Sequence, residues 1–150
     1  MTDRAEPLRV EVKPELQNLR LMRRAVRDGL GERGVTAATT EMALLVLDEV
    51  VSNSIEHGIA YRTTFPPLVV RLVVDAADVL VDYVDPEVPG AIVDGLAAAL
   101  TASRGGDVPP PESERGRGLY LVATLLTDLT IEHASGGGLH LHGRLLGDGP

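Results

Sequence analysis

The spacing of apolar and polar positions predicts a short strand and a helix at the start of the chain. From Leu8 to Val12 apolar residues alternate with charged ones, which is typical of a half-buried strand. Pro14 stands where helices accept proline in their first turn, and the apolar positions after it recur every three or four residues. Glycines at 29, 31 and 34 are expected to mark the end of this helix.

A second helix is predicted from about Thr36 to His57, with Gly58 as its left-handed stop. Its apolar residues fall on two roughly opposite sides, so the helix should be packed between layers. One stripe consists of Met42, Leu45, Val46 and Val50, and the other of Leu44, Leu47, Val51 and Ile55.

The remaining apolar pattern predicts a hairpin, two further helices and two closing strands. In chain order these are strands Leu68–Asp75 and Val79–Val84, a helix at Ala91–Ser103, a helix from near Gly118 with Leu119, Val122, Leu125, Leu126 and Leu129 inside, and strands Leu129–His133 and Leu139–Leu145. This order favours an α+β fold: a two-layer sandwich with helices on one face of a mixed, largely antiparallel sheet.

Two segments are predicted to be irregular. Residues 104–115 are rich in glycine, proline and charge, and we expect them to form a lid over a site. The tail, Gly147–Pro150, is expected to be frayed. The 150 residues are otherwise read as a single domain.

Composition and charge exclude several classes of function. The absence of cysteine excludes disulfide frameworks, thiol nucleophiles and cysteine-ligated metals. A formal net charge of -8 argues against direct nucleic-acid binding. The only lysine is Lys13, so the chain has no GxxxxGK phosphate loop. With no secretory pattern and no membrane-spanning apolar run, we expect a cytoplasmic protein.

The second predicted helix carries the first candidate site. Glu49, Asn53 and His57 follow at intervals of four residues and therefore share one face. This face could simply be the wetter end of the helix, with Asn53 bonded to nearby backbone. It could equally be a metal-and-base face, in which Asn53 offers a carbonyl oxygen to Mg²⁺ and Glu49 deprotonates a nucleophile.

Three further positions are candidates. Residues 114–119 (ERGRGL) could bind an anion at a helix start through backbone N–H groups and Arg117, or could be an ordinary flexible helix entry. Asp85, at a strand end before Pro86, could be a site residue or a turn residue. His140 and His142 share a strand face, which favours a solvated sheet surface over a metal pair.

Taken together and in order, these pieces resemble the Bergerat-fold (GHKL) ATPases and, more narrowly, the small anti-sigma-factor serine kinases. Residues 49–58 (EVVSNSIEHG) match the asparagine box of that family. Residues 81–86 (VDYVDP) correspond to its first glycine box, and residues 116–122 (GRGLYLV) to its second, with Asp128 following. The resemblance covers nearly the whole chain.

The resemblance implies a role for each matching residue. Asn53 would coordinate Mg²⁺ on the phosphates of ATP, Glu49 would be the general base, and Asp85 would accept a hydrogen bond from the adenine amino group. The other implied nucleotide contacts are His57, Arg115, Gly116, Arg117, Gly118 and Leu119. The implied partners are a STAS-type anti-sigma-factor antagonist, which is phosphorylated, and a sigma factor, which is sequestered. A homodimer is also implied.

One departure from the family pattern divides the functional hypotheses. The family has Asp-x-Gly in its first glycine box, whereas this chain has Asp85, Pro86 and Glu87. If the Glu87 carboxylate points into the pocket it should repel the nucleotide, which would favour a non-catalytic protein-binding regulator over a serine kinase. The catalytic domain of a histidine kinase is a third reading, disfavoured because 150 residues leave no room for a phosphoacceptor domain.

Overall fold

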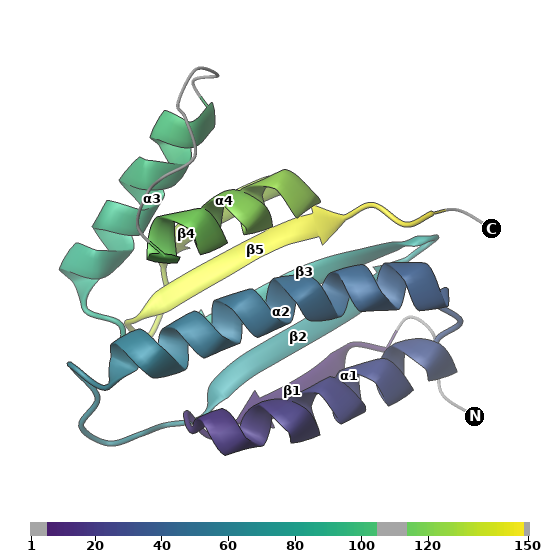
Figure 1. Cartoon of the computed structure of the whole chain (residues 1–150), viewed down its shortest axis with the longest axis horizontal. Coiled ribbons are helices and arrows are strands. Elements are labelled where there is room, and N and C mark those ends of the chain that lie inside the picture. The colour runs from purple at the N-terminus through teal and green to yellow at the C-terminus, as the bar shows by residue number, and fades with distance from the viewer. Residues whose placement is uncertain (1–5, 105–113, 149–150) are drawn as a thin grey trace.

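A five-stranded sheet carries its helices on one face (Figure 1). The computed structural model describes residues 6–104 and 114–148, and the backbone alone at residues 104 and 114–117. The elements are β1 (Leu8–Val12), a 3₁₀ turn (Leu16–Asn18), α1 (Leu19–Glu32), α2 (Ala37–Gly58), β2 (Leu68–Asp75), β3 (Asp78–Asp85), α3 (Gly90–Arg104), α4 (Glu114–Leu125), β4 (Leu126–His133) and β5 (Leu139–Leu145).

The strand order is β1-β2-β3-β5-β4, and all four neighbouring pairs are antiparallel. Side chains alternate along each central strand, so one face of the sheet is buried under the helices and the other is more open. α2 lies between α1 and α4 over the middle of the sheet (Figure 1). The predicted α+β sandwich is confirmed.

Helix α2 packs in the core, but only the second of its two predicted apolar stripes is buried along its whole length. Val46 and Val50 of the first stripe are buried, whereas Met42 and Leu45 are 38% and 44% exposed. The sheet covers one side of α2 and its neighbouring helices cover the flanks, so the outward side of its N-terminal half remains at solvent. Thr36 caps the helix, since its hydroxyl accepts a hydrogen bond from the Thr39 amide at 3.2 Å.

Several predicted boundaries are wrong. Gly29 and Gly31 lie inside α1, and Gly34, with a φ of 79°, is the left-handed residue that follows it. Gly58 is not a left-handed stop, because it lies inside α2 without a positive φ. A Cβ at Gly58 would lie 2.4 Å from Nε of Arg62, so glycine is needed there for close approach.

The second half of the chain brings two more corrections. Helix α4 begins at Glu114 and α3 ends at Arg104, so both ends of the predicted lid are helical. The middle of that segment, residues 105–113, lies outside the described residues. Leu126 and Leu129 belong to β4 instead of a helix.

The tail is anchored at its described residues instead of being frayed from Gly147. The Gly147 amide donates to Asp78 at 2.8 Å. The Asp148 carboxylate accepts from the hydroxyls of Thr36 and Thr39, and these bonds lower the pKa of Asp148. The chain end is therefore fastened over the start of α2. Residues 149 and 150 lie outside the described part.

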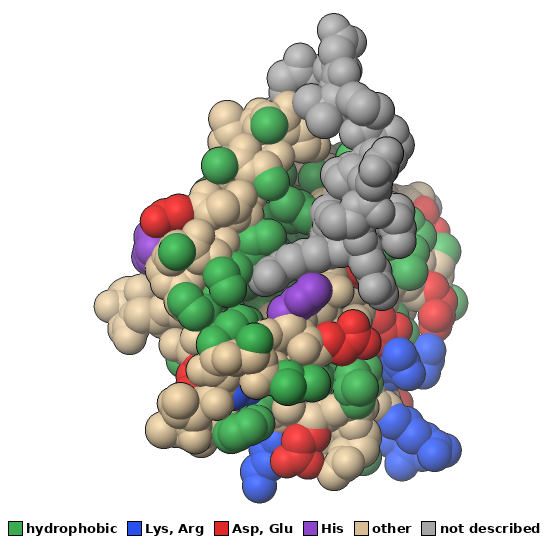
Figure 2. All heavy atoms as spheres, turned by 60° about the vertical axis from the view of Figure 1, so that its left-hand side comes forward, with side chains coloured by type: hydrophobic (Ala, Val, Ile, Leu, Met, Phe, Trp, Pro, Cys, Tyr) green, Lys and Arg blue, Asp and Glu red, His purple; other side chains and the backbone are tan. Residues whose placement is uncertain are grey.

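Two further features concern the hydrophobicity of the helices and the distribution of side chains on the surface. Across residues 6–104 and 114–148, every helix falls short of the length and hydrophobicity needed to cross a bilayer. Seen from the end that carries α3, apolar side chains gather beside this helix, while basic side chains lie toward the lower edge of the view (Figure 2).

Candidate functional site

The last turns of α2 hold the candidate acid and amide side by side. The Asn53 amide donates from Nδ2 to Oε1 of Glu49 at 3.1 Å, as the four-residue spacing on one helical face allows. Both side chains are half-buried. Among the described residues one donor occupies one of its lone-pair sites, so with respect to these residues the carboxylate keeps most of its acceptor capacity.

Gly118 of α4 packs directly on this pair. A Cβ at Gly118 would lie 2.0 Å from Oε1 of Glu49 and 2.7 Å from Nδ2 of Asn53. An added Cβ would have to displace these side-chain ends, so the glycine allows the backbone of α4 to approach the polar end of α2 without disturbing them. The structure thus brings together residues of the first and second candidate segments, 65 positions apart in the chain.

The donor set at this junction fits a magnesium–phosphate group. The Asn53 amide nitrogen is turned to Glu49, and within the described residues its carbonyl oxygen accepts no hydrogen bond. Amide and carboxylate oxygens are the ligands that Mg²⁺ prefers. The first turn of α4 includes Arg115 and Gly116, and the amides of a first turn have no acceptor inside their helix.

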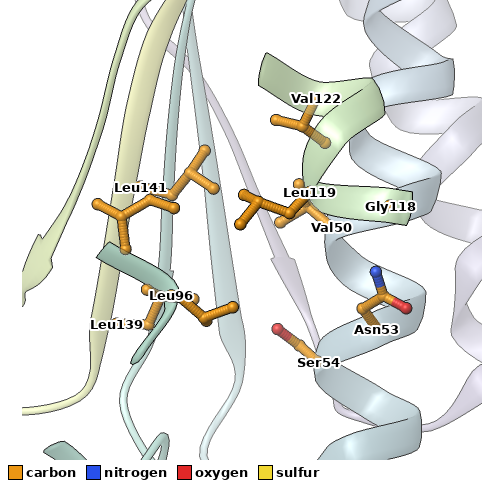
Figure 3. Close-up of a pocket in the computed structure, with 10 residues that line it drawn as sticks. Val50, Asn53, Ser54, Leu96, Gly118, Leu119, Val122, Leu139 and Leu141 are labelled. Atoms are coloured by element: carbon orange, nitrogen blue, oxygen red, sulfur yellow. The ribbon is translucent and has the colours of Figure 1, made fainter. Parts of the chain in front are cut away.

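A cavity of about 50 Å³ opens next to the junction, as Figure 3 shows. Asn53 and Ser54 border it from α2, and Gly118 and Leu119 from α4. The other lining residues are apolar, namely Val50, Leu96, Val122, Ile131, Leu139 and Leu141. This lining, apolar with a few polar groups at the rim, is that of a small-molecule site, but the volume is well below the roughly 300–1,000 Å³ of a site that encloses a drug-sized ligand.

Asp85 does not line this cavity. It is fully buried and faces Arg62, whose Nη1 donates to Oδ1 at 2.9 Å and whose Nη2 donates to Oδ2 at 2.6 Å. Burial lowers the pKa of Arg62, but the hydrogen bonds and charge of Asp85 outweigh it, and the pKa is raised. Burial and the same carboxylate raise the pKa of the neighbouring Tyr83 phenol.

Glu87 does not line the cavity, and its carboxylate is bound to the loop that follows Arg62. Its carboxylate accepts from the backbone amides of Thr63, Thr64 and Phe65 at 2.9, 3.1 and 2.9 Å, and also from two threonine hydroxyls. Partial burial raises the pKa of Glu87, but these bonds outweigh it and lower the pKa to about 2. Glu87 therefore fastens the loop that follows Arg62.

The other sequence candidates lie around these two centres or away from them. His57 is half-buried in the last turn of α2 and forms no side-chain hydrogen bond within the described residues. Gly116 and Arg117 lie in α4, with Arg117 described by its backbone alone. His140 and His142 lie on the open face of the sheet, where His140 pairs with Asp82, and the described ranges contain no cluster arranged to hold a metal ion.

Sequence reasoning missed Arg62 and misjudged the environment of Asp85. A single arginine after a helix end is normally a solvated loop residue, so its position carries no signal. The one available signal was Glu87 itself. A carboxylate in place of a glycine beside Asp85 adds negative charge at a strand end. Two neighbouring carboxylates are stabilised by a cation close to them, so this pair indicates one.

Comparisons with known proteins agree with this architecture. The model of the histidine kinase-like ATPase domain matches residues 12–142. No curated protein sequence matches the chain. Among solved structures, a chain of the SiaB–SiaC complex from Pseudomonas aeruginosa superposes with a TM-score of 0.72 at 14% identity, over 92% of this chain and 88% of that one. At that identity the likeness shows the fold alone. Because the family model spans most of its length, the chain belongs to the histidine kinase-like ATPase domain family.

Proposed function

We propose that this protein binds Mg-ATP and acts as a serine kinase on a STAS-type anti-sigma-factor antagonist, sequestering a sigma factor as its second role. The observation that supports this is the junction of Glu49, Asn53 and Gly118, where oxygen ligands of α2 meet α4 beside a cavity. The matched chain from a two-protein complex agrees with a function exercised on a protein partner.

Each residue has a stated part in the proposal. Asn53 would bind Mg²⁺ through its carbonyl oxygen, and the start of α4 would bind phosphate oxygens through its amides. Bound magnesium would neutralise phosphate charge. Glu49 would accept the proton of the substrate serine, because its carboxylate lies one helical turn from Asn53 and has further acceptor sites that no described residue occupies.

The test separates binding from chemistry. A general base contributes about 10²–10⁴-fold to rate and little to ground-state affinity. Glu49→Ala should therefore keep the Kd for Mg-ATP and lose transfer of radiolabelled phosphate to purified STAS-type proteins. Asn53→Ala should lose both. Calorimetric titration and the transfer assay measure the two effects, and circular dichroism controls for folding. Undiminished transfer by Glu49→Ala would remove Glu49 from the proposed role.

A second candidate function is a non-catalytic protein-binding regulator. The enclosed Asp85 favours it, because the carboxylate that the resemblance assigns to adenine is already paired. Titration of the unaltered protein with ATP, with and without Mg²⁺, discriminates the two. Binding in neither condition would favour the regulator.

A further inference from the structure

The Asp85 carboxylate is nearly saturated by donors from its own chain. A carboxylate offers about four lone-pair sites. Arg62 occupies one on each oxygen, and the Glu87 amide occupies a second on Oδ1 at 3.1 Å. The Arg62 side chain is 1% exposed and that of Asp85 is 0% exposed. Three of the four acceptor sites of the carboxylate are therefore taken by the chain itself, two of them by the Arg62 guanidinium.

Arg62 is itself held from several directions. Its Nη2 also donates to the carbonyl of Ser54 at 2.9 Å, which ties it to the helix turn that borders the cavity. Gly58 leaves just enough room for its Nε. Glu87 fixes residues 63–65, the loop segment directly after it. An ion pair with this much support does not open without leaving two buried charges unpaired.

These contacts bear on how a purine base is recognised. The adenine amino group is a hydrogen-bond donor, and so is a guanidinium, so both compete for the same carboxylate acceptors. We propose that Arg62 determines specificity by taking the place of the adenine amino group at Asp85. The chain then binds nucleoside triphosphates through their phosphate end, without selecting adenine over guanine. This inference rests on the proposed nucleotide site at Asn53.

The experiment compares base selectivity between variants. Kd values for Mg-ATP and Mg-GTP are measured by calorimetry on the unaltered protein, Arg62→Ala and Arg62→Lys. The lysine variant keeps a positive charge at this position but loses the bidentate hydrogen bonding to Asp85. Arg33→Ala is the matched control, because Arg33 is also buried but donates to backbone carbonyls near β1.

The inference has a definite expected outcome. The unaltered protein and Arg33→Ala should bind Mg-ATP and Mg-GTP with equal Kd values. Arg62→Ala should prefer ATP by about tenfold or more, which corresponds to one hydrogen bond to a charged acceptor. Arg62→Lys should show a smaller preference for ATP, and it carries the test if Arg62→Ala does not fold.

The other outcomes separate this inference from the proposed function. Selection of ATP over GTP by the unaltered protein overturns the inference and leaves ATP binding intact. Binding of ATP by an Arg62 variant alone overturns nucleotide binding by the natural chain, and with it the inference. Folded Arg62 variants that still do not discriminate the bases overturn the inference. If no form binds either nucleotide, both are overturned.

Discussion

Two acidic centres near the end of α2 differ in how much of their acceptor capacity the chain itself uses. Within the part of the chain that the structure describes, Glu49 accepts one hydrogen bond, from Asn53 at 3.1 Å, and lies half-buried against the backbone of Gly118. Asp85 accepts three hydrogen bonds and is fully enclosed with Arg62. The first centre has capacity left for a ligand and the second has almost none. Two residues that match motifs of the same family thus differ in how many of their acceptor sites the described chain occupies.

The largest effect should come from removing one partner of the closed centre. Arg62→Ala leaves the Asp85 charge buried and unpaired, and the free energy of unfolding should fall by about 3–5 kcal/mol. Glu49→Ala at the open centre should change it by less than about 1 kcal/mol. Urea denaturation of both variants measures the contrast.

A double variant sharpens this prediction. Arg62→Leu combined with Asp85→Leu removes both charges, so it should be more stable than Arg62→Leu alone. Equal stability losses for Arg62→Ala and Glu49→Ala would contradict the distinction between a closed and an open centre.

A middle-sized effect is expected where α4 packs on the open centre. Gly118→Ala places a methyl group 2.0 Å from Glu49, so the helix or the carboxylate has to move. We expect a stability loss of about 1–3 kcal/mol and weaker Mg-nucleotide binding.

Gly31→Ala in α1 is the matched control. Its Cβ meets nothing within 4 Å, and alanine is the better helix former by about 1 kcal/mol, so this variant should be neutral or stabilised. Thermal unfolding and nucleotide titration report on both variants. If Gly118→Ala binds nucleotide as tightly as the unaltered protein, α4 does not form part of the site.

The smallest effect is a pH dependence that originates at Glu87. Its pKa is lowered from 4.5 to about 2 in the folded protein, so its stabilising contribution is complete above pH 4.5 and is lost as the pH falls toward 2. Glu87→Gln should be less stable at neutral pH and should show a shallower loss across that interval. Urea midpoints at several pH values measure the slope, with Glu56→Gln at an exposed position of α2 as the control. Parallel slopes for Glu87→Gln and the unaltered protein would show that Glu87 does not clamp the loop.

The central strands were predictable because their alternation is regular and one face is buried. Strand β4 was harder, since its register with β5 shifts between Thr127 and Thr130, and Asp128 has a φ of 54°. The irregularity buries Leu126 and Leu129, three residues apart, which imitates a helical spacing. The spacing of the apolar residues alone therefore predicted a helix that continued into what is strand β4.

The residues of the candidate site also differ in how far the sequence could predict their surroundings. Glu49 and Asn53 are one helical turn apart, so local geometry alone placed them together. The environment of Asp85 depends on Arg62, 23 positions earlier, and on a loop fastened by Glu87. No local period encodes such a contact, so the apolar pattern could locate Asp85 at a strand end, and only the added charge of Glu87 pointed to a cation beside it.

The close approach of Arg62 to Gly58 also constrains how such a chain can evolve. Any side chain at position 58 collides with the guanidinium, so that glycine is required for as long as Arg62 is present. Replacing Glu87 by glycine alone releases the loop but leaves Arg62 on Asp85. Replacing Arg62 alone leaves the Asp85 carboxylate buried without a partner charge. The effects of substitutions at positions 58, 62, 85 and 87 therefore depend on one another, and an open acceptor at Asp85 is reached only through an order of substitutions in which each intermediate still folds.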